Sequence, residues 1–132
     1  MIEIHPFALG QTQFCKTALS PFGQKLGAAT STCFIIASGP ALTLFISSIL
    51  LAIGVAILES HPQFGKYLIA WAGVDFINHA VYAYSALGTE SWRLNHDFVH
   101  LGIFGLHPMV ATVGIVTIPI IITLCSYWTK PE

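Results

Sequence analysis

Two long stretches without a single charged residue constrain this chain more than any other feature. The first, residues 33–58, reads CFIIASGPALTLFISSILLAIGVAIL, and the second, residues 109–128, reads MVATVGIVTIPIIITLCSYW. About 20 apolar residues are enough for a helix to cross the hydrocarbon core of a bilayer. We therefore expect both stretches to form transmembrane helices.

The composition supports a surface that is solvated by lipid. Charged residues make up 8% of the 132 residues and hydrophobic residues 55%, whereas a typical soluble protein has roughly 25% charged residues. The net charge is −1 and the sequence has no basic patch, which argues against nucleic acid as a partner. We expect an integral membrane protein of a bacterial inner, photosynthetic or organellar membrane.

A third apolar stretch, residues 67–88, differs from the other two because it carries polar side chains. Asp75, Asn78, His79 and Tyr82 are spaced i, i+3, i+4 and i+7, which places them on one helical face. A carboxylate near the middle of a membrane costs about 2.5–3.5 kcal/mol, so it must face protein, a cofactor or a water pocket. We expect Asp75 to meet His79, or partners on another subunit. The alternative is a helix packed beneath the first span, as in a soluble protein.

The predicted fold class is all-α, with three transmembrane helices. The N-terminal arm, residues 1–32, is too polar to span a membrane and is predicted to lie at the interface. A slight excess of Lys and Arg favours a cytoplasmic N-terminus. The predicted order is the arm, three spans and a polar tail, at residues 1–32, 33–58, 67–88, 109–128 and 129–132.

A second polar group lies before the last span, in the stretch NHDFVHLGIFGLHP. His96 and His100 stand four residues apart, so a helix would place both imidazoles on one face, with Asp97 beside them. Imidazole nitrogens and carboxylates are common ligands of zinc and iron. The sequence therefore predicts a candidate metal site at these three residues. The zinc-protease signature has Glu at the position that Asp97 occupies.

The same HDxxH pattern resembles the first histidine box of the membrane fatty-acid desaturases and carotenoid oxygenases. In that family several boxes together hold two irons. The present chain has no HxxHH box after His100 and six histidines in all. The resemblance would therefore imply an incomplete di-iron site.

A cofactor is the second possible use of these histidines. A histidine inside or at the edge of a span can ligate haem or chlorophyll axially. His79 is the first candidate, with Asp75, Asn78 and Tyr82 as further cofactor-binding residues. His100 and His107 near the membrane edge are further candidates for the ligand.

The stretch DFVH, from Asp97 to His100, is similar to the Asp-Tyr-Val motif near the quinone site of succinate dehydrogenase and fumarate reductase anchors. Those anchors also have three spans and this chain length, so the resemblance implies a haem- or quinone-binding membrane anchor. His79 lies farther from Asp97 than the haem histidine of that family lies from its motif. The resemblance therefore does not extend to His79.

A purely structural explanation of the region remains open beside these. Gly88 can end the second span, Asn95 can cap the next helix and Pro108 can start the third span. The three histidines at 96, 100 and 107 would then be polar residues at the membrane interface, with no ligand.

A further resemblance involves GQTQF, residues 10–14, and ASGPALTLFISSILL, residues 37–51. Together they resemble the middle of the site-2 protease family of intramembrane zinc proteases, in which a Gly-Pro pair opens a span. Thr43 stands where that family usually has Asn. The family implies a zinc held by an HExxH helix and a later aspartate, to which Asp75 or Asp97 could correspond. HExxH is absent, so the resemblance implies a truncated, inactive relative or one half of a split enzyme.

The leading hypothesis is a small non-catalytic subunit of a larger membrane complex, such as a respiratory or photosynthetic assembly. Its expected partners are the lipid bilayer and other membrane subunits. Three spans are few for an independent transporter or enzyme, and no catalytic residue is assigned. The alternatives are a membrane anchor that binds haem, chlorophyll or quinone, and a metal-dependent membrane enzyme.

Overall fold

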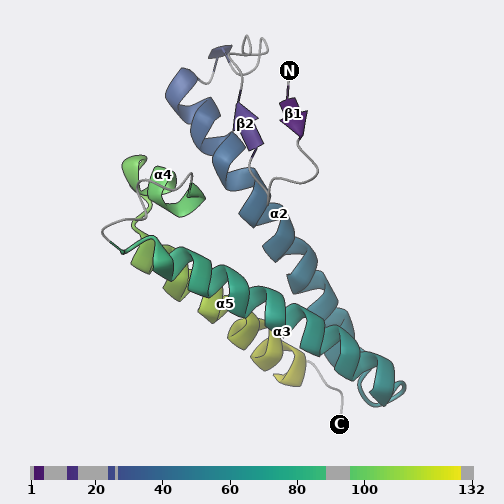
Figure 1. Cartoon of the computed structure of the whole chain (residues 1–132). Helices are drawn as coiled ribbons and strands as arrows, with labels where there is room; N and C mark the ends of the chain where they lie inside the picture. Colours follow the sequence, from purple (N-terminus) through teal and green to yellow (C-terminus); the bar gives the residue numbers. More distant parts are fainter. Residues whose placement is uncertain (1, 5–11, 15–23, 26, 89–95, 129–132) are drawn as a thin grey trace.

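The described part of the chain is dominated by long helices (Figure 1). This computed structural model describes residues 2–4, 12–14, 24–25, 27–88 and 96–128. The helices are α2 (Ala28–Ala56), α3 (Pro62–Ser85), α4 (Asp97–Ile103) and α5 (Pro108–Trp128). The predicted helical class is confirmed for this part of the molecule.

Two short strands lie in the predicted N-terminal arm, and the all-α prediction missed them. β1 (Ile2–Ile4) pairs antiparallel with β2 (Thr12–Phe14). Most of the arm lies outside the described residues, as does the tail at 129–132.

Two helices are long and apolar enough to cross a membrane by length and composition, rather than the three predicted. They are Thr30–Ala56, within α2, and α5. By the same measure α3 does not qualify, so the predicted third span is not shown. This helix covers most of the stretch predicted at 67–88, but it begins at Pro62 and includes Gln63, Lys66 and Asp75. These polar residues, together with Asn78 and His79, make α3 the least apolar of the three long helices.

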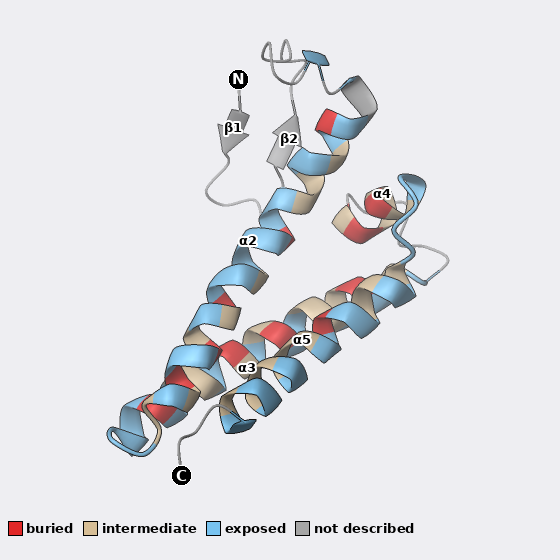
Figure 2. Cartoon of the chain, turned by 180° about the vertical axis from the view of Figure 1, so that it is seen from behind, coloured by how far each residue is buried: buried red, intermediate tan, exposed pale blue. Residues whose placement is uncertain are grey.

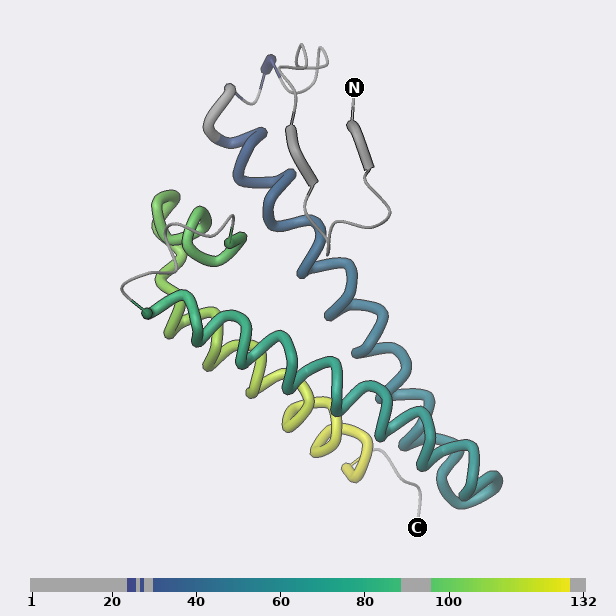
Figure 3. The backbone as a smooth tube through the Cα atoms, viewed as in Figure 1, coloured from purple at the N-terminus to yellow at the C-terminus, as the bar shows by residue number. Residues whose placement is uncertain are grey.

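The three long helices pack around α3. The chain turns back at 57–61, so α2 and α3 run in opposite directions, and α5 lies along α3 (Figure 1). The backbone trace in Figure 3 shows α2 and α3 diverging from this turn. α4 lies at the open end and contacts both α2 and α5. The result is a V of two helices, with α5 beside one arm and α4 across the opening.

Glycines determine how closely the arms of the V approach at its closed end. A Cβ added at Gly54 would lie 3.0 Å from Leu68 Cβ and 3.0 Å from Ile69 Cγ1. A Cβ added at Gly65 would lie 2.9 Å from the carbonyl oxygen of Gly54 and 3.0 Å from Leu58 Cα. Real Cβ atoms rarely come so close to backbone atoms, so side chains at these positions would push α2 and α3 apart.

Few residues are enclosed between the helices. Figure 2 shows the buried positions facing inward and long exposed surfaces on the outside. The buried apolar side chains are those of Leu51, Ala72, Phe76, Ala83, Phe98, Leu101 and Ile115. The core therefore lies along α3 and is closed by α4 at the open end.

The helix ends differ in part from those predicted. α3 ends at Ser85, before Gly88. The N-cap of α4 is His96, without a side-chain capping hydrogen bond, whereas Asn95, the predicted cap, lies outside the described residues. Pro108 begins α5 as expected, and the backbone N–H of Met109 donates to Nδ1 of His107 at 3.2 Å.

Candidate functional site

A cluster of three polar side chains joins α2 to α3 inside the bundle. The Ser47 hydroxyl donates to Oδ2 of Asp75 at 2.6 Å. On the other side of the carboxylate, Nδ1 of His79 lies 3.4 Å from Oδ1. The same nitrogen lies 3.0 Å from the backbone carbonyl oxygen of Asp75. We call Ser47, Asp75 and His79 the Asp75 cluster.

Helical spacing and burial explain how this cluster is assembled. Asp75 and His79 are one turn apart on α3, so their side chains meet on one face. Ser47 is only 3% exposed, and its small side chain faces the neighbouring helix. The buried Ala72 and Phe76 lie next to the cluster along α3. The carboxylate therefore has a hydrogen-bond donor and an imidazole within an otherwise apolar interface.

The four polar residues predicted on one face of α3 have different neighbours in the structure. Asp75 meets His79, which confirms that predicted contact. Asn78 is exposed, and Tyr82 contacts a different histidine, His96. The four side chains therefore do not form one contiguous cluster.

Ser47 was not predicted as a partner of Asp75. In the sequence it was only one of several small residues on the first span. No fixed spacing connects it to Asp75, because the two residues are 28 positions apart on different helices. Its polarity within an apolar helix was the only available signal.

A second cluster joins the end of α3 to the start of α4. The rings of Tyr82 and His96 stack with centroids 3.9 Å apart and an interplanar angle of 17°. Phe98 approaches the Tyr82 ring edge-on, with centroids 5.6 Å apart. Nε2 of His96 lies 2.9 Å from the Ser85 hydroxyl oxygen. We call Tyr82, Ser85, His96 and Phe98 the His96 cluster.

The hydrogen bonds of Ser85 indicate the tautomer of His96. The Ser85 hydroxyl donates to the backbone carbonyl oxygen of Tyr82 at 2.7 Å, so its single proton is used. The N–H that points to Ser85 then belongs to Nε2 of His96. Nδ1 of His96 is enclosed and has no hydrogen-bond partner in the described part of the chain.

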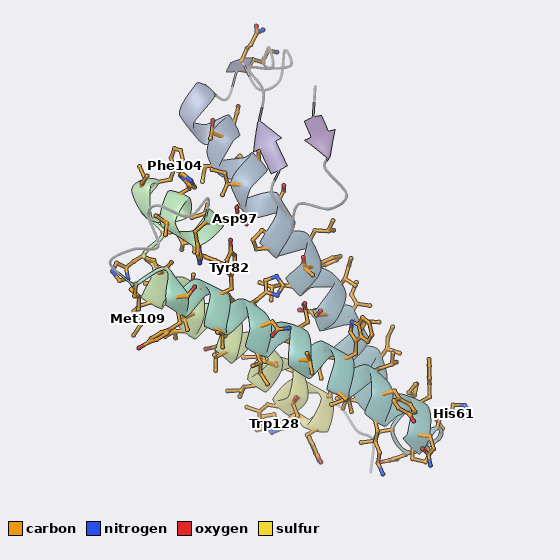
Figure 4. The ribbon with its side chains drawn as sticks, in the orientation of Figure 1. His61, Tyr82, Asp97, Phe104, Met109 and Trp128 are labelled. Atoms are coloured by element: carbon orange, nitrogen blue, oxygen red, sulfur yellow. The ribbon has the colours of Figure 1, made fainter. Side chains whose placement is uncertain are left out.

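Asp97 connects to the His96 cluster through its backbone. Its N–H donates to the Tyr82 hydroxyl at 3.2 Å, and Figure 4 shows Tyr82 extending from α3 toward Asp97. Burial is the largest effect on both titratable neighbours: it lowers the pKa of His96 and raises the pKa of Asp97. Each shift disfavours the charged form of its group.

The residues of the predicted metal site are not arranged around a common metal position. His96 is enclosed and stacked on Tyr82, while Asp97 and His100 are half-buried on α4. Within the residues that the structure describes, no group of three or more His, Cys, Asp or Glu side chains is placed to hold a metal ion. The proximity in sequence therefore does not produce a three-ligand site here.

Comparison with protein-family models, curated proteins and solved structures finds no match to this chain. The resemblances to site-2 proteases, to histidine-box enzymes and to three-span anchors therefore stay predictions. The Asp75 and His96 clusters are the two candidate sites that the geometry itself defines.

Proposed function

We propose that this chain is a small non-catalytic subunit that is embedded in a membrane and packs against other helices of a larger complex. The observation that carries the proposal is the apolar exterior of the bundle. Large side chains such as Phe45, Trp71 and Leu124 are exposed on α2, α3 and α5, respectively. Contiguous apolar surfaces of this kind are stable in lipid or against another apolar helix.

The low burial of the two most apolar helices supports lipid as their surroundings. In the most apolar window of α2, and likewise of α5, 11% of the residues are buried. The core helix of a soluble protein would be mostly buried. These helices instead present most of their apolar residues outward.

The proposal includes α3 as a third membrane-crossing helix. Its 24 residues give a length of about 36 Å, against about 30 Å for the hydrocarbon core. Asp75, which makes the helix less apolar, accepts a hydrogen bond from Ser47 of α2 and has His79 beside it. A carboxylate that is satisfied by neighbouring side chains is compatible with a membrane interior.

The upper part of α2 supports an association with further subunits. There α2 has diverged from α3 (Figure 3), and Phe34 and Leu42 are exposed near the small, exposed residues Ser38 and Gly39. Small residues allow close approach of another helix in lipid. Respiratory and photosynthetic assemblies, which contain many small helical subunits, are the complexes that we propose.

Membrane extraction and co-purification test the proposal. The chain is expected to stay in the membrane pellet after alkaline carbonate treatment. After solubilisation in a mild detergent, it is expected to elute with other membrane proteins. Release into the carbonate supernatant would contradict membrane embedding, and a monodisperse monomer from native membranes would contradict the subunit role.

A further inference from the structure

One ring nitrogen of His79 is held in place by Asp75. Nδ1 lies 3.0 Å from the backbone carbonyl oxygen of Asp75 and 3.4 Å from its Oδ1. Both neighbours are hydrogen-bond acceptors, so the proton of a neutral imidazole belongs on Nδ1. Nε2 then carries a lone pair, for which the described residues provide no donor.

That second nitrogen belongs to a side chain that is only partly buried. Among the described residues, the only side-chain nitrogen or oxygen that is both enclosed and unpartnered is Nδ1 of His96. Nε2 of His79 is not such an atom, and the His79 side chain is 16% exposed. In a membrane interior there is no water to satisfy Nε2. Its partner must come from outside the described residues.

The surroundings favour a particular class of partner. A bare metal ion such as zinc needs about four ligands, and the described residues hold no group of three or more metal-ligating side chains. A metallotetrapyrrole brings four nitrogens of its own and needs only an axial ligand from the protein. Its flat apolar ring is also compatible with the apolar side chains around α3.

The contact with Asp75 is the support that an axial imidazole requires. Histidine ligands of metals usually donate their other ring N–H to a carbonyl or carboxylate oxygen, which fixes the ring orientation. Asp75 provides both kinds of oxygen to Nδ1 of His79. Ser47, through its hydrogen bond to Oδ2, fixes the carboxylate in turn.

We propose that Nε2 of His79 is the axial ligand of a metallotetrapyrrole, a haem or a chlorophyll, bound beside α3 within the membrane. Asp75 is a positioning residue, which orients the imidazole without touching the metal. The inference rests on the proposed location of α3 in a membrane. Carbonate extraction tests the embedding of the chain in a membrane separately from cofactor binding.

The buried histidine, His96, does not offer the same chemistry. Nε2 of His96 is bonded to Ser85, and its Nδ1 is enclosed by the chain. Nδ1 is therefore closed to an external group in this structure. His79 is therefore the better axial ligand of the two.

Cofactor titration of the full-length chain tests the proposal. The chain in mild detergent micelles is titrated with iron protoporphyrin IX and, separately, with chlorophyll a, and absorbance spectra are recorded. One of the two is expected to bind saturably at one molecule per chain, which identifies the class of tetrapyrrole. Saturation by neither would overturn the proposal.

Variants of His79 identify the ligand. His79→Ala is expected to weaken binding at least ten-fold, while the matched variant His61→Ala, at an exposed histidine outside the bundle, is expected to bind like the unchanged chain. Equal binding by His79→Ala and the unchanged chain would overturn the assignment. Far-UV circular dichroism checks that the variants are folded.

Two further variants keep the assignment testable if His79→Ala does not fold. His79→Met retains a possible axial ligand of different chemistry and is expected to shift the absorption band. Asp75→Asn is expected to weaken binding about ten-fold, as loss of a supporting contact to a metal ligand typically does. An unchanged spectrum in His79→Met would exclude His79 as the ligand.

Discussion

The Ser47 side chain is small, but it helps to satisfy a carboxylate that lies between two helices. It supplies a hydrogen-bond donor to Asp75, whose carboxylate otherwise has, among the described residues, His79 as its polar neighbour. Hydrogen bonds to charged groups contribute about 1.5–3 kcal/mol. A single hydroxyl can therefore offset a substantial part of the free energy needed to bury the carboxylate.

We predict that Ser47→Ala lowers the free energy of unfolding by about 1–3 kcal/mol, because Oδ2 of Asp75 loses its donor. Ser48→Ala is the matched control: the Ser48 hydroxyl donates only to the carbonyl oxygen of Leu44 in its own helix. This variant is expected to be nearly neutral. Unfolding in detergent micelles, followed by circular dichroism, measures both; equal effects would show that the interhelical bond adds no stability.

Protonation of His96, at the start of α4, is expected to make the stability of the chain depend on pH. The imidazole is 5% exposed and its burial lowers its pKa below the usual value of about 6.5, although the neighbouring Asp97 opposes this shift. Between the folded-state pKa and about 6.5, the unfolded chain binds more protons than the folded chain. Stability is therefore expected to fall as the pH falls through this window.

We predict that the unchanged chain is less stable at pH 5.5 than at pH 7.5 and that His96→Phe reduces this difference. Phenylalanine keeps an aromatic ring against Tyr82 but does not titrate. The raised pKa of Asp97 has the opposite sign and acts at lower pH, since protonation of a buried carboxyl favours the folded chain. Thermal unfolding at both pH values provides the measurement; an identical pH dependence in both proteins would contradict the role of His96.

At the scale of elements, the crossing of α2 and α3 depends on the absence of side chains. Gly54 and Gly65 face each other at the closed end of the V, where added Cβ atoms would meet backbone or neighbouring side chains at about 3 Å. The divergence of the two helices begins beyond this contact. The angle of the V is thus set at one end and maintained by α4 at the other.

We predict that Gly65→Ala destabilises the bundle by roughly 1–3 kcal/mol, as overpacking of a tight contact does. Gly73→Ala on the same helix is the control, because a Cβ there would have nothing within 4 Å. Alanine is favoured over glycine inside a helix by about 1 kcal/mol, so this variant is expected to be neutral or stabilising. Chemical unfolding in micelles compares the two; a Gly65→Ala variant as stable as Gly73→Ala would contradict the close crossing.

At the scale of the whole molecule, the long helices could be predicted because their signal is local. Uncharged runs predicted α2 and α5 to within a few residues, apart from the earlier start of α2 at Ala28. The start of α3 was missed by as much as the start of α2, since Pro62 and Lys66 do not continue an apolar run. The strands β1 and β2 have no comparable signal in three residues each.

The candidate site was predictable only where it depends on spacing within one helix. Asp75 and His79 are one turn apart, so their contact follows from helical geometry. Tyr82 lies on the same face, but its ring stacks on His96, next to α4, instead of joining Asp75 and His79. Such contacts between separate helices depend on how the chain folds back, which the spacing of residues along one helix does not specify.

The hydrogen bond between Ser47 and Asp75 also has a consequence for how the chain is made. A helix that carries an ionised carboxylate enters lipid poorly by itself, since the free energy is unfavourable by about 2.5–3.5 kcal/mol near the membrane centre. α2 precedes α3 and is joined to it by the short connection 57–61, so its serine is already present when the carboxylate arrives. For the membrane protein proposed here, we therefore expect α2 and α3 to enter the membrane together as a hairpin rather than one after the other.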